Sequence, residues 1–172
     1  MSRISHGIAS RIFRRILVPH DFSDHATRAL EIAAGLAAPD STLTVLHAVV
    51  PVSTSIGVPG ADLTWTPPPE MVNDLERELE EIVTRTVGRA TATRVKCRVV
   101  TADPLTAILA AARRADVIVM TTVGRTGLTH LLMGSVAEKV VRHATVPVLT
   151  IHPAAARRAT AAPRKRRRVS AR

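Results

Sequence analysis

Five short apolar runs rich in β-branched residues alternate along the chain with four stretches of helical spacing. Parallel strands need a crossover helix between them, so this alternation favours a parallel sheet with right-handed connections. We therefore predict an open α/β sheet, Rossmann-like, with helices on both faces. The predicted strands are Arg15–Pro19, Leu43–Val50, Val95–Val100, Asp116–Met120 and Val146–Ile151.

Capping residues and apolar spacing delimit the four helices. The third starts where a capping aspartate precedes a proline at the first helical position. The fourth starts at Ser135, and Glu138 three residues later predicts a capping box. The helices are expected to run from Ser23 or Asp24 to before Pro39, from Glu70 to about Arg89, from Asp103-Pro104 onward and from Ser135 onward.

The composition fits a core built from aliphatic side chains. Apolar residues make up 46% of the 172 residues but aromatic residues only 2%, as in a parallel sheet buried on both faces. No apolar run approaches the roughly 18 residues that span a bilayer, so we expect no membrane partner. Cys97 is the single cysteine. It excludes an internal disulfide, favours a cytoplasmic location and is expected to be buried and inert.

The net charge of +10 belongs mainly to the C-terminal tail. Residues 157–172 contain eight of the 24 basic side chains and no acidic one. We expect residues 1–11 to form a flexible extension, residues 12–152 the folded domain, and residues 153–172 a disordered basic tail. Such a tail can attract nucleic acid through phosphates without reading bases, which makes non-specific nucleic-acid binding through residues 157–172 one hypothesis.

Residues 51–69 interrupt the alternation with five prolines. We predict a long loop between the second strand and the second helix. A loop of this length serves as a lid, forms an interface or lacks order, and the sequence leaves these three interpretations open.

Two strand ends carry residues that suit a ligand site. Strand one ends in residues 19–23 (PHDFS), and strand four leads into a segment with Gly124, Gly127 and Gly134. Ligands of open parallel sheets bind beyond the carboxyl ends of the strands. Glycines and a helix N-terminus can cradle a phosphate, and Asp21 can accept hydrogen bonds from a ribose or base. On spacing alone, ordinary turns explain the glycines equally well.

Three segments together resemble the universal stress protein family. Residues 16–23 resemble its opening strand and turn, residues 115–140 its closing signature, and residues 146–149 its last strand. The similarity covers roughly residues 12 to 152, with the motifs in the family's order and spacing. It implies a five-stranded parallel sheet of order 3-2-1-4-5, a regulatory stress-response role, a homodimer paired through the last strand, and ATP or a related adenine nucleotide, with Mg²⁺ at its phosphates, between strands one and four.

The family's nucleotide motif is Gly-x-x-Gly, nine residues, then Gly-Ser or Gly-Thr. Gly124 and Gly134-Ser135 match it, while Thr121 replaces the first glycine. By this resemblance, Pro19 and Asp21 face the adenosine and Ala48 lies beside the adenine. Met120 lines the pocket next to Thr121. The residues implied around the phosphates are Gly124, Arg125, Gly134, Ser135 and Val136.

Three other functions stay open at this point. The replacement at Thr121 is compatible with a dimeric interaction module of the same fold that binds no nucleotide. The basic tail is compatible with a nucleic-acid tether. Weak ATP hydrolysis also stays open, although the sequence shows no catalytic residue: His20 beside Asp21 has no Ser or Cys nucleophile in a recognisable arrangement.

Overall fold

The computed structural model describes residues 13–55, 62–88, 94–122 and 134–152. The proposed N-terminal extension and basic tail therefore lie outside the described residues, as do Gly124, Arg125 and Gly127. The elements in chain order are β1 (Arg15–Pro19), α1 (Asp24–Leu36), β2 (Thr42–Val49), β3 (Val52–Ser55), β4 (Asp62–Trp65), α2 (Pro69–Val87), β5 (Arg94–Thr101), α3 (Pro104–Ala112), β6 (Val117–Thr121), α4 (Ser135–His143) and β7 (Val148–Ile151).

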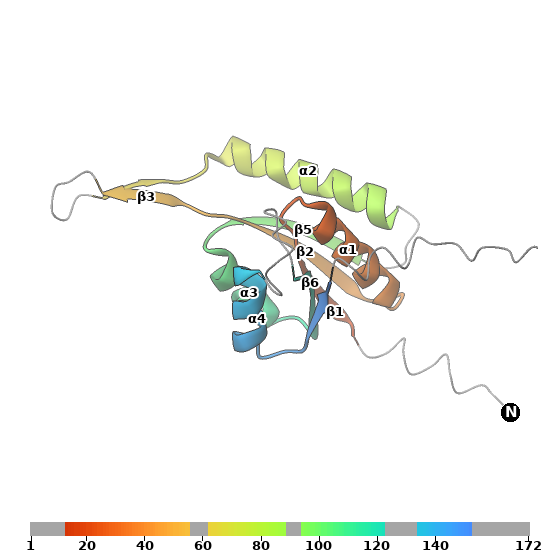
Figure 1. Ribbon diagram of the computed structural model, residues 1–172. Helices are drawn as coiled ribbons and strands as arrows, with labels where there is room; N and C mark the ends of the chain where they lie inside the picture. The colour runs from red at the N-terminus through yellow and green to blue at the C-terminus, as the bar shows by residue number, and fades with distance from the viewer. Residues whose placement is uncertain (1–12, 56–61, 89–93, 123–133, 153–172) are drawn as a thin grey trace, which may run out of the picture.

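A five-stranded parallel sheet forms the centre of the molecule, as the alternation predicted. Its strand order is β5-β2-β1-β6-β7, which is the expected order 3-2-1-4-5 in terms of the five predicted strands. Helices α1 and α2 pack on one face, where they contact β6 and β5 respectively, and α3 and α4 pack against each other on the opposite face. Figure 1 shows these layers around the sheet.

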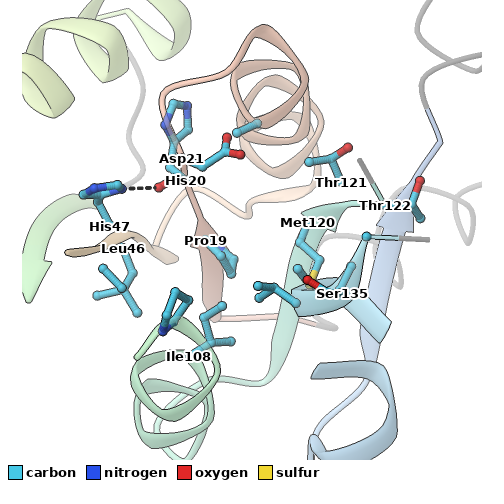
Figure 2. A pocket seen from close by; sticks show the side chains of 16 residues that line it. Pro19, His20, Asp21, Leu46, His47, Ile108, Met120, Thr121, Thr122 and Ser135 are labelled. Atoms are coloured by element: carbon cyan, nitrogen blue, oxygen red, sulfur yellow. Dashed lines mark hydrogen bonds between the residues drawn. The ribbon is translucent and has the colours of Figure 1, made fainter. Parts of the chain in front are cut away.

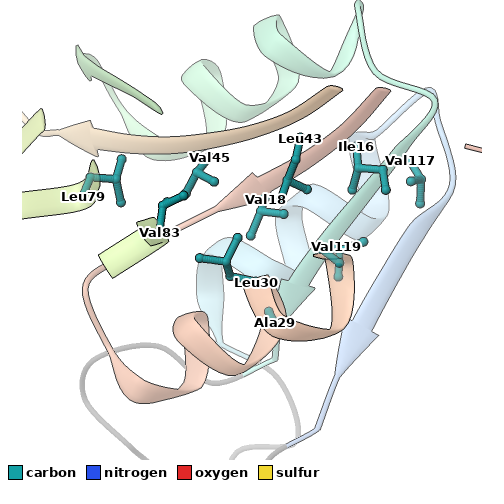
Figure 3. Close-up of a cluster of buried hydrophobic side chains, with 11 residues drawn as sticks. Ile16, Val18, Ala29, Leu30, Leu43, Val45, Leu79, Val83, Val117 and Val119 are labelled. Atoms are coloured by element: carbon teal, nitrogen blue, oxygen red, sulfur yellow. The ribbon is translucent and has the colours of Figure 1, made fainter. Parts of the chain in front are cut away.

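Alternating strand residues supply two hydrophobic clusters, one for each face. Ile16 and Val18 point toward α1 and α2, whereas Leu17 between them faces α3 and α4. Figure 3 shows the first cluster, in which Leu30 of α1 and Leu79 of α2 pack onto the strands. The central strands β1 and β6 are thus covered by helices on both faces, which explains why they read as continuous apolar runs.

The proline-rich segment differs from the predicted loop because it contains two strands. β3 and β4 form a separate antiparallel ribbon in which Val52 is opposite Trp65. The hydroxyls of Ser53 and Thr64 lie 3.1 Å apart across it. The ribbon extends beyond the helices (Figure 1), with Trp65 47% exposed.

The predicted starts of α1, α3 and α4 are confirmed, and the predicted side-chain cap of α4 is wrong. Ser23 caps α1 by accepting a hydrogen bond from Ala26 N, and Asp103 caps α3 by accepting one from Thr106 N. In α4, however, the N-cap is Gly134, and no side chain caps the helix. The predicted capping box therefore does not form. Glu138 instead pairs with Arg142 one turn further along.

An aspartate joins the amino ends of β1 and β6. Asp116 Oδ2 accepts hydrogen bonds from Arg14 N and Arg15 N, both at 2.9 Å. Its Oδ1 accepts two more from the Arg15 guanidinium. The Arg15 side chain and these amides hold the pKa of Asp116 below its ordinary value, against the opposing effect of burial. This Asp116 clamp, formed with Arg14 and Arg15, lies at the amino ends of the strands, opposite to the carboxyl ends where the sequence predicted a ligand site.

Cys97 is half-buried in β5 rather than fully buried as expected. Burial raises the pKa of its thiol to about 11, and Glu80 and Glu76 of α2 act in the same direction. The thiol is therefore protonated at neutral pH and a poor nucleophile, in agreement with the predicted inertness. Within the described part of the chain, no helix combines the length and the apolar character needed to cross a bilayer.

Candidate functional site

The crevice lies between β1 and β6, where the strand order of the sheet reverses. These strands pair only near their amino ends, at Ile16–Val117 and Leu17–Ile118, whereas β1 and β2 pair along five positions. Pro19 ends β1 and has no N–H to continue a ladder. Beyond this point the chain from β1 enters α1 on one face of the sheet, while α4 packs on the other face. This place between β1 and β6 is the topological switch point of the open sheet.

A cavity of about 230 Å³ occupies this switch point. Eight of the ten residues that the resemblance assigned to a site line it, and Gly124 and Arg125 are outside the described residues. The eight come from three separate strand ends and from the start of α4, as Figure 2 shows for several of them. They are Pro19, Asp21, Ala48, Met120, Thr121, Gly134, Ser135 and Val136.

The turn between β1 and α1 places Asp21 on the cavity wall. Asp21 Oδ1 accepts hydrogen bonds from the Ser23 amide at 3.1 Å and the Ser23 hydroxyl at 2.5 Å. Ser23 in turn caps α1. Phe22 between them has φ of 66°, and it is the single non-glycine residue with a positive φ in the described part of the chain. This left-handed residue reverses the chain sharply enough for the helix to start at once.

His20 is buried beneath this turn, with an exposed fraction of 3%. Its Nδ1 accepts a hydrogen bond from Phe22 N at 3.1 Å, and its Nε2 lies 3.3 Å from Thr27 Oγ1. Burial lowers the pKa of His20 to about 4. Attraction to Asp21 partly opposes this shift and repulsion from His47 adds to it. His20 is therefore a neutral imidazole at physiological pH.

His47 of β2 ties the second strand to the same turn. Its Nδ1 lies 2.8 Å from the His20 carbonyl oxygen, so Nδ1 carries the proton and donates. Figure 2 shows this hydrogen bond at the cavity wall. The Phe22 ring packs edge-on against His47, with 4.5 Å between ring centroids. His47 was not among the site residues that the sequence predicted, although it lines the cavity.

The N-terminus of α4 forms the opposite wall. Gly134 N donates to Thr122 O at 2.5 Å, and the first intrahelical bond of α4 runs from Glu138 N to Gly134 O. The amides of residues 135–137 therefore belong to the first turn, where backbone N–H groups have no partner within the helix. Gly134 has φ of −68°, a value open to any residue, so positive φ does not explain the glycine.

Thr121 and Thr122 end β6 beside this helix. Thr121 lies within the strand and has no positive φ, so replacing the motif glycine creates no backbone strain. Thr122 is 7% exposed, and its buried Oγ1 has no hydrogen-bond partner among the described residues. A buried hydroxyl without a partner costs free energy unless a ligand or water satisfies it.

Apolar side chains complete the cavity between these polar walls. Leu46 and Ala48 extend from β2, Ile108 from α3 and Met120 from β6. Sequence reasoning missed several lining residues: Ala26, Leu46, Pro104, Ile108, Thr122 and Ala137. The apolar ones carry no detectable signal, because helical spacing does not separate a cavity wall from ordinary core.

Metal ligands do not cluster in the described part of the chain, where no group of three or more His, Cys, Asp or Glu side chains could hold an ion. The cavity instead combines a carboxylate, an apolar slot and a helix N-terminus. This set suits an organic ligand with a flat apolar part, hydroxyls and an anionic group.

Comparisons with known proteins match the chain to one family over most of its length. The universal stress protein family model matches residues 12–152. A universal stress protein of Methanocaldococcus jannaschii is 30% identical over 145 residues, covering 81% of this chain and 82% of that protein. A crystal structure of a universal stress protein family member from Burkholderia pseudomallei has a TM-score of 0.53 and 30% identity, covering 82% of this chain and 97% of that one.

The fold also matches that of a universal stress protein crystallised in complex with cAMP. The TM-score is 0.57 at 24% identity, and the match covers 82% of this chain and 98% of the other. At that identity the likeness shows a shared fold. The family model and the M. jannaschii relative both span most of the chain, so this chain belongs to the universal stress protein family.

Proposed function

We propose that this chain binds ATP or a related adenine nucleotide in the β1/β6 crevice and acts as a regulatory stress-response protein. The observation that carries the proposal is the cavity at the switch point of the sheet, which joins Asp21, an apolar slot and the start of α4. In open α/β sheets this position is the usual place for a ligand.

Each part of a nucleotide meets a suitable part of the cavity. The slot between Ala48, Ile108 and Met120 fits a flat base, which gains from burial of its apolar faces. The Asp21 carboxylate accepts hydrogen bonds from ribose hydroxyls. The amides of Ser135 and Val136, at the positive end of the α4 dipole, attract phosphate oxygens.

Two hydroxyls beside the α4 N-terminus support the phosphate end of the proposal. Ser135 is exposed and does not cap the helix, so its hydroxyl is free of the structural role that a capping box would give it. Thr122 Oγ1 is buried without a partner in the described residues. A phosphate oxygen near this helix start is an acceptor for either hydroxyl.

Mg²⁺ fits the proposal as part of the bound nucleotide. The ion is usually held by phosphates, waters and one or two carboxylates rather than by an all-protein cage. Where bound, it would neutralise phosphate charge. The residues of this chain would bind and orient the base and ribose through Asp21 and the apolar slot.

A regulatory role fits the site better than catalysis. His20 is the histidine closest in sequence to Asp21, but its Nδ1 already accepts the Phe22 amide and its Nε2 faces Thr27. The lone pair that a general base needs is therefore occupied. The sequence left weak ATP hydrolysis open, and this geometry assigns no group to it.

We further propose a cytoplasmic homodimer paired through β7. β7 is an edge strand of the sheet, and its Leu149 is 39% exposed. The other edge strand, β5, exposes Arg94, Lys96 and Arg98, and charges of this kind oppose pairing with a further strand. β7 has no charged residue along its length, so it is the edge suited to a second copy of the chain.

Ligand-induced stabilisation tests the nucleotide proposal. A ligand present at a hundredfold excess over its Kd adds about 2.7 kcal/mol to the free energy of unfolding. We expect Mg-ATP, ADP or cAMP to raise the Tm of the full chain by roughly 5–10 °C, and GTP to raise it less. Measurement at low and high salt separates the cavity from attraction by the basic tail, because only the latter is lost on screening.

Gly134→Asp supplies the matched control. Position 134 has φ of −68° and is the N-cap of α4, where aspartate is a favourable residue. The variant should therefore fold, yet its carboxylate repels phosphate. Stabilisation of the wild type by an adenine nucleotide, lost in Gly134→Asp, supports the proposal. No stabilisation of the wild type by any adenine nucleotide contradicts it.

A further inference from the structure

We propose that His20 is a positioning residue that, as a neutral imidazole protonated on Nε2, holds the β1–α1 turn in the conformation that presents Asp21 to the crevice. The consequence for nucleotide affinity rests on the proposed function. The effect on the turn itself does not.

The turn contains a backbone conformation that needs support. A bulky L-residue rarely adopts the left-handed region that Phe22 occupies at φ of 66°. Its amide donates to His20 Nδ1 at 3.1 Å. This hydrogen bond links the residue before Asp21 to the residue after it, so it fixes the direction in which the Asp21 side chain leaves the backbone.

The surroundings of His20 select one tautomer. Nδ1 accepts the Phe22 amide, so the proton of the neutral ring resides on Nε2 and points to Thr27 Oγ1 at 3.3 Å. The Thr27 hydroxyl donates its own hydrogen bond to Ser23 O at 3.1 Å. Three hydrogen bonds, from Phe22 to His20, from His20 to Thr27 and from Thr27 to Ser23, thus connect residues on either side of Asp21.

The backbone of His20 is held from β2 as well. Its amide donates to Leu46 O at 2.8 Å, and its carbonyl accepts from His47 Nδ1 at 2.8 Å. Three elements therefore fix this residue: β1 through the strand, β2 through Leu46 and His47, and α1 through Thr27. The His20 imidazole connects these contacts to the Phe22 amide, because its Nδ1 accepts the hydrogen bond of that amide.

Protonation of His20 would break the arrangement. A proton on Nδ1 would face the Phe22 N–H, which is also a donor, and the turn would have to open. The titratable groups acting on His20 are Asp21 of the same turn, which favours the proton, and His47 of β2, which opposes it, while burial disfavours it most strongly. α1 faces the ring with the uncharged Thr27.

The pH dependence of stability follows from these pKa values. In the unfolded chain a histidine has a pKa near 6.5, whereas His20 in the fold has a pKa of about 4. At a pH between these two values, His20 is protonated in the unfolded chain but neutral in the folded protein. The stability that His20 contributes is thus complete above pH 6.5 and declines as the pH falls toward 4.

Substitutions at position 20 separate the two ring nitrogens. Asn places an amide oxygen where Nδ1 lies and can accept the Phe22 amide, whereas Gln reaches the Nε2 position and leaves that amide unsatisfied. We expect NMR of the wild type to show the Nε2–H tautomer and a His20 pKa well below 6. We also expect His20→Asn to keep wild-type amide shifts at residues 21–23, and His20→Gln to change them.

Nucleotide binding gives the second readout. At neutral pH we expect His20→Asn to bind Mg-ATP with a Kd within about threefold of the wild type, and His20→Gln to bind about tenfold more weakly, as expected for one lost hydrogen bond. His143→Asn is the matched control, because that histidine is exposed on α4, outside the cavity, and its Nδ1 lies 2.8 Å from Lys139 O. Its affinity should equal that of the wild type.

A wild-type His20 with the Nδ1–H tautomer, or with a pKa of 6 or above, overturns the proposal. An equal conformation of the turn in the Asn and Gln variants overturns it as well. If the wild type binds no nucleotide, the proposed function fails while the NMR readout still decides the role of His20. If the Gln variant does not fold, the tautomer and pKa of the wild type decide it.

Discussion

Phe22 adopts a left-handed backbone conformation in the sharp turn between β1 and α1. A left-handed conformation costs an L-residue roughly 1–2 kcal/mol relative to glycine. The Phe22 ring offsets this cost by packing edge-on against His47 and His20. The same turn carries Asp21, so the strain is located at the proposed site, where over-determined surroundings commonly sustain it.

A pair of substitutions measures this strain. Phe22→Ala and Phe22→Gly lose the same ring contacts, but only alanine keeps the steric cost of positive φ. We expect the glycine variant to be more stable than the alanine variant by about 1 kcal/mol, measured by urea unfolding. In the interior of α1 the order should reverse, with Ala34→Gly costing about 1 kcal/mol. An alanine variant at position 22 as stable as the glycine variant would show that the turn is unstrained.

At the scale of secondary-structure elements, α1 and α4 begin in different ways. Ser23 caps α1 with its side chain, whereas α4 is capped by Gly134 and leaves Ser135 exposed at its first turn. The difference separates a structural serine from one that is available to a ligand.

Alanine substitutions distinguish these two serines. Ser23→Ala should lower the free energy of unfolding by about 1 kcal/mol, the usual value for a lost N-cap. Ser135→Ala should change it by less than about 0.5 kcal/mol, as for other surface substitutions, and should weaken Mg-ATP binding instead. Thermal unfolding and calorimetry on both variants check this. A destabilised Ser135→Ala would mean that the hydroxyl supports the helix after all.

The strands β1 and β6 are held together at their amino ends by Asp116. We expect Asp116→Ala to lower the free energy of unfolding at neutral pH by about 1–2 kcal/mol, because it leaves two backbone amides and a guanidinium without their acceptor. Glu138→Ala, which removes only an exposed pair on α4, should cost less than about 0.5 kcal/mol.

Acid should erase the difference between wild type and Asp116→Ala. The pKa of Asp116 in the fold lies below its ordinary value. The stability it contributes is therefore present above pH about 4 and is lost as the pH falls through the folded-state pKa. A difference that persists unchanged in strong acid would show that the carboxylate charge has no part in the clamp.

The elements were predictable where local residues decide them. The cap at Ser23 and the Asp103-Pro104 start follow from neighbouring residues and were confirmed. The cap of α4 was misjudged because Ser-x-x-Glu spacing fits a serine at the first helical position as well as a serine at the N-cap. The ribbon of β3 and β4 was missed because each strand has only four residues, and their pairing depends on contacts across a proline-rich segment.

At the scale of the whole molecule, the sheet edges differ in what they allow. β5 presents basic side chains, whereas β7 presents none along its length. We expect light scattering to show a dimer of the full chain at tens of micromolar. Leu149→Lys, which places a charge on the β7 edge, should give a folded monomer near neutral pH. A monomeric wild type would contradict the proposed pairing.

The architecture was more predictable than the site it creates. The parallel sheet follows from alternation and its strand order from the family resemblance, and this order brings the ends of β1 and β6 together. Eight predicted site residues consequently line one cavity. The wall formed by Leu46 and Ile108 was not predictable, because apolar residues that line a cavity have the same spacing as those that fill a core.

Calorimetric titration of Mg-ATP into the full chain, run beside Asp21→Ala and Asp40→Ala, tests whether the β1/β6 crevice binds the nucleotide. Asp40 is an exposed aspartate just before the amino end of β2. It lies at the opposite end of the strands from the crevice and serves as the matched control. We expect saturable one-to-one binding to the wild type and to Asp40→Ala, and at least about tenfold weaker binding to Asp21→Ala, a loss of roughly 1.4 kcal/mol. Equal affinity of all three proteins, or no binding by the wild type, would contradict it.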